Sequence, residues 1–111
     1  MNSKDPEFPK IVCLCGSTRF GEAFTRANLD ETLAGNIVLT IGCNLPDDGL
    51  FSDYSDDELR EIKLRLDELH KRKIDLADEV LILNVDGYIG FSTCGEITYA
   101  RNHNKRVRFL E

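Results

Sequence analysis

Four short apolar runs alternate with segments of helical pattern along this chain. The runs cover residues 11–15, 37–41, 80–83 and 107–110. Continuous apolar runs of this length are typical of strands that are buried on both faces of a parallel sheet. Because strands that alternate with helices favour parallel pairing with right-handed crossovers, the order predicts a βαβαβαβ unit. We therefore expect an α/β fold, a small Rossmann-like or flavodoxin-like sandwich with a four-stranded parallel sheet.

Capping signals place the helices between these runs. Ser17 or Thr18 is predicted to cap the first helix, and Gly35 is predicted to end it. Residues 55–58 match a capping box, so a second helix is expected to begin there and to end in the basic run 70–73. The third helix is expected at residues 93–102, and the loop at residues 44–54 is a candidate lid over a site.

Size and charge limit the classes of protein to consider. A chain of 111 residues is typical of one domain, which we assign to residues 10–111, with the polar residues 1–9 as a disordered segment or tag remnant. No apolar run approaches the roughly 18 residues that a membrane span needs. The formal charge of −6 disfavours nucleic acid as a partner, because nucleic-acid binders usually carry a concentrated basic surface. We expect a cytoplasmic protein without a membrane or nucleic-acid partner.

The cysteines indicate reduced thiols. Cys13, Cys15, Cys43 and Cys94 form no CxxC pair, and no histidine stands at zinc-ligand spacing from them. This spacing argues against a disulfide framework and a structural metal. Cys13 and Cys15 are two apart on a predicted strand and so share a face, where core packing is favoured over a redox or metal role.

The loop after the first strand has the residues of an anion site. Gly16, Ser17, Thr18 and Arg19 offer a flexible backbone, two hydroxyls and a guanidinium near a helix start. The loop lacks GxGxxG, and Glu22 stands where a Walker A motif requires lysine, so neither nucleotide fingerprint is present. A tight turn with a serine cap is the alternative interpretation.

The loop after the third strand carries more chemistry. It runs from Asn84 through Tyr88 and Gly90 to Ser92, Thr93 and Glu96. Gly87 and Gly90 allow close backbone approach to a ligand, and the hydroxyls stand at a predicted helix start. Thr93 to Glu96 is also a capping box, in which Glu96 would only return to the Thr93 amide. The local sequence alone favours this cap.

Two motifs carry a resemblance to a known family. Gly90-x-Ser92-Thr93-x-x-Glu96, after an apolar strand, resembles the Gly-x-Gly-Thr-x-x-Glu element of nucleoside 2-deoxyribosyltransferases, and is similar to that of deoxynucleoside monophosphate N-glycosidases and cytokinin-activating phosphoribohydrolases. Cys15-Gly16-Ser17-Thr18-Arg19 resembles the first-loop Cys-Gly-Ser-x-Arg of the monophosphate glycosidases. Together the motifs and the strands between them cover nearly the whole chain.

The resemblance implies roles for particular residues. Glu96 would be the nucleophile that takes the sugar as a covalent ester before water or a second base releases it. Ser17, Arg19, Ser92 and Thr93 would hold a 5′-phosphate or sugar hydroxyls, together with Gly16, Thr18, Asn84 and Gly90 in the same loops. No cofactor is implied, and the relatives are oligomeric, so a homodimer or higher homo-oligomer is expected.

The family pattern includes a group that protonates or orients the leaving base, and at the positions of that group this sequence has other residue types. His70 falls at the helix position of a family aspartate, with Asp67 and Asp75 nearby, although a lone histidine beside lysines is more often a solvated helix end. Gly90 replaces an acidic residue and Cys13 an aromatic hydroxyl, so Tyr88 or Asp86 would have to substitute. The chain also stops before the C-terminal segment that relatives use to complete a neighbour's site.

Three hypotheses follow. The first is an enzyme that cleaves or exchanges the N-glycosidic bond of a nucleoside or its 5′-monophosphate, with Glu96, His70 and Tyr88 as catalytic candidates. The second is a nucleotide-binding module that has lost turnover, which the departures at Gly90 and Cys13 favour. The third is a related hydrolase of ribosyl bonds in a dinucleotide such as NAD.

Overall fold

A single parallel sheet organises the described part of the chain. The computed structural model describes residues 7–41 and 53–111. Within them the elements are β1 (Ile11–Cys15), α1 (Gly21–Leu33), β2 (Ile37–Leu39), α2 (Asp56–Leu76), β3 (Glu79–Ile82), the 3-10 turn η1 (Val85–Gly87), α3 (Phe91–Asn102) and β4 (Arg106–Phe109). The four strands pair in parallel in the order β2-β1-β3-β4. The predicted α/β sandwich with βαβαβαβ order is confirmed.

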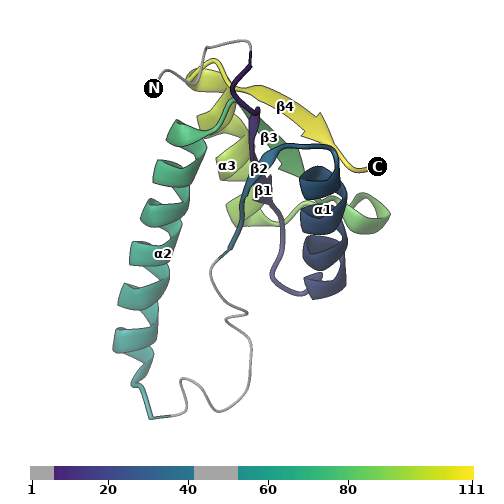
Figure 1. Cartoon of the computed structure of the whole chain (residues 1–111). Coiled ribbons are helices and arrows are strands. Elements are labelled where there is room, and N and C mark those ends of the chain that lie inside the picture. The colour runs from purple at the N-terminus through teal and green to yellow at the C-terminus, as the bar shows by residue number, and fades with distance from the viewer. Residues whose placement is uncertain (1–6, 42–52) are drawn as a thin grey trace.

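The sheet separates two apolar layers (Figure 1). One layer joins Val12 and Leu14 of β1 to Phe24 and Ala27 of α1. The other joins Cys13 and Cys15 to buried residues of α2 and α3, such as Ile74. Successive strand residues point to opposite faces, so β1 supplies both layers. Helix α1 therefore covers one face, and α2 and α3 cover the other.

The strand order indicates where a ligand-binding crevice lies, between the carboxyl ends of β1 and β3. β1 connects outward to β2 on one side, while β3 and β4 follow on the other side, so the chain changes direction between β1 and β3. Loops at the carboxyl ends of two such strands diverge and leave a crevice between them. In this chain these loops are residues 16–20 after β1 and residues 83–90 after β3.

Several predicted boundaries were wrong. Neither Ser17 nor Thr18 caps α1, which begins at Gly21 after Phe20. Residues 17–20 instead form a turn, in which the Phe20 amide donates to the Ser17 carbonyl at 3.1 Å. β2 ends at Leu39 instead of residue 41 and is only half-buried, because it lies at the sheet edge. β3 and β4 each begin one residue earlier than predicted.

Helix ends that depend on strong local signals were predicted correctly. Ser55 caps α2: its hydroxyl accepts from the Glu58 amide at 3.1 Å, and the Glu58 carboxylate accepts from the Ser55 amide at 2.9 Å. Gly35 follows the end of α1 with a φ of +90°, a conformation that favours glycine. The capping-box start of α2 and the glycine stop of α1 are therefore confirmed.

The far end of α2 differs from prediction. The helix continues through the basic run 70–73 to Leu76, and only Lys73 falls in its last turn. His70 is buried at 7% exposure, so the solvated helix end that charge alone favoured is wrong for this residue. The amino-terminal half of α2 extends past the sheet (Figure 1), where Leu64 is 69% exposed.

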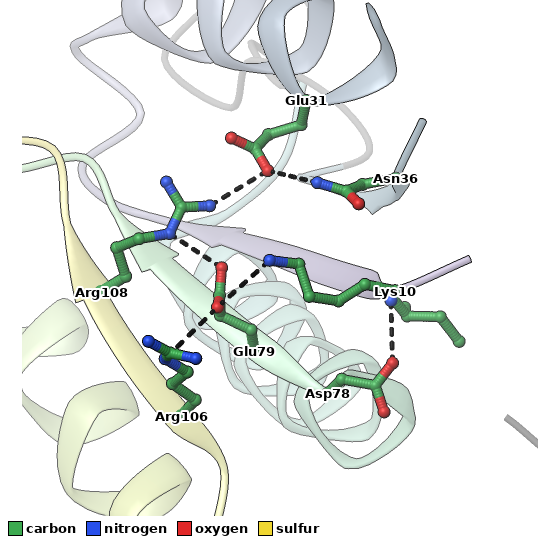
Figure 2. A network of polar contacts seen from close by, with 8 residues as sticks. Lys10, Glu31, Asn36, Asp78, Glu79, Arg106 and Arg108 are labelled. Atoms are coloured by element: carbon green, nitrogen blue, oxygen red, sulfur yellow. Dashed lines mark hydrogen bonds and ion pairs between the residues drawn. The ribbon is translucent and has the colours of Figure 1, made fainter. Parts of the chain in front are cut away.

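A charged network joins the strands near their amino-terminal ends, opposite the crevice. Glu79, at the start of β3 and 2% exposed, accepts from Arg108 Nε at 2.8 Å and from Lys10 Nζ at 3.5 Å. Arg108 also donates to Glu31 of α1 at 3.0 Å, and Arg106 pairs with Glu79 at 3.8 Å (Figure 2). Because each Glu79 oxygen faces a cation, the buried carboxylate is compensated and ties α1 to the sheet.

Two sequence predictions lie wholly or mostly outside the described residues. The candidate lid at residues 44–54 falls there except for its last two residues, and the polar segment 1–9 does so except for residues 7–9. Among the helices of residues 7–41 and 53–111, none combines the length and apolar character that crossing a bilayer requires.

Candidate functional site

A pocket of about 560 Å³ lies at the carboxyl ends of β1 and β3. The loop after β1 contributes Gly16, Ser17 and Thr18. The segment after β3 contributes Tyr88, Gly90, Phe91, Ser92, Thr93 and Glu96, and α2 closes the side with Lys63, Leu66, Asp67, Leu69, His70 and Lys73. The two loops thus meet in one pocket, and Glu96 lies in its wall.

Most of the predicted site residues line this pocket, but Arg19 and Asn84 are not among its lining residues. Arg19 lies beside it, with its guanidinium 4.4 Å from the Tyr88 ring centroid and its Nε donating to Ser17 Oγ at 3.2 Å. Asn84 is buried, and its side-chain amide makes two hydrogen bonds to the backbone of Glu111. That pairing fits a structural role, with Asn84 holding the segment after β4 against the loop after β3.

Glu96 is not a capping residue. Helix α3 begins at Phe91 with Gly90 as its N-cap, two residues before the predicted start, and Gly90 makes no side-chain cap. Thr93 is therefore inside the first turn, where its side chain is 4% exposed. The capping box that the local sequence favoured does not form, and Glu96 lies further along the helix as part of the pocket wall.

Burial governs the electrostatics of Glu96. Removal from water raises the pKa of its carboxyl group, because the charged form loses hydration, and the nearby positive charge of His70 opposes that rise. Asp67 and Cys13 add negative charge that acts in the same direction as burial. The carboxylate therefore stands in an environment where interactions with a ligand are poorly screened.

His70 packs against two cysteines below the pocket. Its Nε2 lies 3.4 Å from Sγ of Cys15 and 3.7 Å from Sγ of Cys13, and both cysteines are fully buried. Burial lowers the pKa of His70, but the hydrogen bond to Cys13 and the negative charges of Cys13 and Glu96 outweigh it and raise the pKa overall. The hydrogen bond from Cys15, aided by His70, lowers the pKa of Cys13 to about 6. The same hydrogen bond to Cys13, together with burial, raises the pKa of Cys15.

Helix α2 adds Lys63, which the sequence motifs did not identify, beside Asp67 and His70, which they did. Lys63 Nζ lies 3.3 Å from both Asp67 Oδ2 and Ser92 Oγ, which joins α2 to the start of α3. Lys73 Nζ donates to the Thr40 carbonyl at 2.6 Å. The helical spacing of Lys63, Asp67 and His70 puts them on one face, and this spacing is the signal that could have found Lys63.

The pocket offers groups that suit an anionic ligand. Lys63, Lys73 and the nearby Arg19 supply positive charge, while Ser17, Thr18 and Ser92 supply hydroxyls. The first amides of α3 have no partner within the helix, and the helix dipole favours an anion beside them. Comparisons with protein-family models, with curated proteins and with solved structures find no match to this chain.

Proposed function

We propose that the pocket binds a nucleoside or its 5′-monophosphate and that Glu96 cleaves or exchanges the N-glycosidic bond. The observation that carries the proposal is the placement of Glu96. The residue is free of the capping role, stands in a 560 Å³ pocket beside His70, and shares that pocket with the hydroxyl-bearing loop after β1. A pocket of this volume is in the range that accepts a nucleotide-sized ligand.

The proposed reaction proceeds in two steps. A Glu96 oxygen attacks the anomeric carbon and forms a glycosyl ester, while the bond from that carbon to the base nitrogen breaks and its electron pair leaves with the base. The Tyr88 hydroxyl supplies the proton that the departing base requires, and His70 holds positive charge beside Glu96. Water or a second base then gives up a proton to the Tyr88 oxygen as it attacks the anomeric carbon, and the bond from that carbon to Glu96 breaks and releases the carboxylate.

Ligand orientation follows from the distribution of charge. Arg19, Lys63 and Ser17 would hold the 5′-phosphate, and Ser92 and Thr93 would hold the sugar hydroxyls near Glu96. No cofactor takes part in these steps as proposed. We also propose a cytoplasmic homo-oligomer, because Phe91 at the pocket rim is 97% exposed and Leu64 on the protruding half of α2 is 69% exposed.

A binding module without turnover is the second candidate, and one observation favours it. A Cβ atom added at Gly90 would lie 3.2 Å from the Tyr88 hydroxyl oxygen. The Tyr88 side chain thus crowds the position where the transferases that this sequence resembles carry an acidic residue. A related hydrolase of NAD would use the same carboxylate and is separated from the first candidate by substrate alone.

The experiment is incubation of the protein with a panel of nucleosides, 5′-monophosphates and NAD, with free base measured by chromatography. Glu96→Gln keeps the shape of the side chain and removes its nucleophilicity, so base release should fall by several orders of magnitude while ligand binding persists. Glu68→Gln is the matched control, because Glu68 is exposed and pairs with Arg72 on α2. Activity that survives in Glu96→Gln contradicts the mechanism. Binding without base release in the wild type favours the binding module.

A further inference from the structure

Cys13, Cys15 and His70 form a buried cluster, and of these three residues the proposed reaction uses only His70. The two thiols lie on one face of β1 because strand side chains alternate, and α2 lays His70 across that face. Their three ligand atoms all lie within 4.8 Å of one another. Sequence spacing argued against a metal because His70 is 55 residues from Cys15, and only the packing of α2 on β1 brings them together.

The distances in this cluster match a tetrahedral zinc site. Zinc binds sulfur at about 2.3 Å and nitrogen at about 2.0 Å, so two such ligands of a tetrahedron stand about 3.6 Å apart. His70 Nε2 lies 3.4 Å and 3.7 Å from the two sulfur atoms, on either side of that value.

The chemistry of the donors is equally suitable. Two thiolates and an imidazole are soft to intermediate ligands that favour Zn²⁺ over Mg²⁺ or Ca²⁺. Two thiolates would balance the charge of the ion, which lowers the cost of burying it. His70 lines the pocket, so the cluster lies next to it.

We propose that Cys13, Cys15 and His70 bind one Zn²⁺ ion as three ligands of a tetrahedral site. The ion would take the place of the proton on His70 Nε2 and supply positive charge at the base of the pocket. This site does not depend on the glycosidic reaction proposed above.

The test is titration of the full chain with Co²⁺, which substitutes for Zn²⁺ and reports thiolate ligands by charge-transfer absorption in the near ultraviolet. The sequence has four cysteines, so the double variant Cys43→Ser with Cys94→Ser keeps only the proposed ligands. This double variant should bind one Co²⁺ with two-thiolate absorption. Zn²⁺ should displace the Co²⁺ and raise the melting temperature, because it binds the folded state.

Ligand variants in that background complete the test. Cys13→Ser and Cys15→Ser should each reduce the thiolate absorption, and His70→Asn should weaken binding by more than about 100-fold, because even loss of a partner of a ligand costs about 10- to 100-fold. Circular dichroism checks that each variant folds. If none of them folds, the double variant alone decides: a Co²⁺ complex without thiolate absorption, or no binding, overturns the proposal.

Glu96→Gln separates this site from the proposed reaction. The variant should lose base release yet keep bound Co²⁺ with its thiolate absorption, because all three ligands remain. Complete loss of Co²⁺ from Glu96→Gln would overturn the three-residue assignment. If the wild-type protein acts on no nucleoside, nucleotide or NAD but binds Co²⁺ through thiolates, the proposed function is contradicted and the metal site is supported.

Discussion

The guanidinium of Arg19 stacks on the ring of Tyr88, with its Cζ atom 4.4 Å from the ring centroid. This contact joins the loop after β1 to the loop after β3, and the Phe20 ring extends it by an edge contact of 5.8 Å with the same tyrosine. A planar cation held on an aromatic face loses little further freedom when it binds a ligand. The two loops therefore present Arg19 in an ordered position beside the pocket.

Arg19→Ala should weaken binding of a 5′-monophosphate about 10- to 100-fold, since a hydrogen bond to a charged group is worth about 1.5–3 kcal/mol. Binding of the matching nucleoside, which lacks the phosphate, should change little. Calorimetric titration with both ligands measures the two dissociation constants. Arg26→Ala is the control, because Arg26 pairs with Asp30 on the outer side of α1. Equal weakening for nucleoside and monophosphate would argue against a phosphate role for Arg19.

Two glycine substitutions should change stability in opposite directions. A Cβ added at Gly16 would lie 3.1 Å from Leu83 Cβ and 3.3 Å from the Leu83 carbonyl oxygen, so Gly16→Ala should cost about 1–3 kcal/mol. Gly95 lies inside α3, and a Cβ there meets nothing within 4 Å, so Gly95→Ala should stabilise by about 1 kcal/mol. Urea unfolding measures both, and a neutral Gly16→Ala would show that β1 and β3 can separate at no cost.

Glu79→Gln should reduce the free energy of unfolding by about 1.5–3 kcal/mol, because Glu79 accepts charged hydrogen bonds from Arg108 and Lys10 at 3% exposure of its side chain. The cost stays below the roughly 3–5 kcal/mol of a fully buried pair, since Arg108 is 40% exposed and can be hydrated. Glu68→Gln, in an exposed pair, should change stability by less than about 0.5 kcal/mol. Chemical denaturation compares the two variants, and similar values would show that the network adds no more than a surface pair.

Acid should remove the contribution of the α2 cap. Hydrogen bonds from Ser55 hold the pKa of Glu58 below its ordinary value of 4.5, so the unfolded chain takes up this proton first as pH falls. The stabilisation by the charged form is present above pH 4.5 and is lost as pH falls through the folded-state pKa. The difference in melting temperature between wild type and Glu58→Gln should therefore shrink in that window. A difference that is constant from pH 7 to pH 2 would contradict this role.

Local signals were sufficient for the order of elements and failed where tertiary packing decides. Ser55 and Gly35 act through their own neighbours in sequence, so α2 and α1 follow the predicted start and stop there. Thr93 to Glu96 carries the same cap signal as Ser55 to Glu58. Thr93 is buried in this fold, however, and the helix extends back to Phe91. Burial of one side chain outweighs a capping interaction worth about 1 kcal/mol.

The role of His70 was hidden for a similar reason. The lysines and arginine that follow it indicate a solvated helix end, yet His70 and Ile74 are one turn apart on the face that packs against β1. Which face of a polar helix meets a sheet depends on residues of that sheet, and no window of sequence around residue 70 includes Cys13 or Cys15. The pocket residues from α2, such as Lys63, were missed for the same reason.

The side chains of β1 alternate between the two apolar layers, so the register of this strand determines the contents of both layers. Val12 and Leu14 face α1, whereas Cys13 and Cys15 face α2 and α3. A shift of β1 by one residue against its neighbouring strands would exchange the two sets. Bulky aliphatic groups would then meet His70, and the thiols would meet Phe24. One slip would therefore disrupt both halves of the interior and dismantle the thiol–imidazole cluster in the same event, so this strand tolerates changes of side chain far better than changes of length.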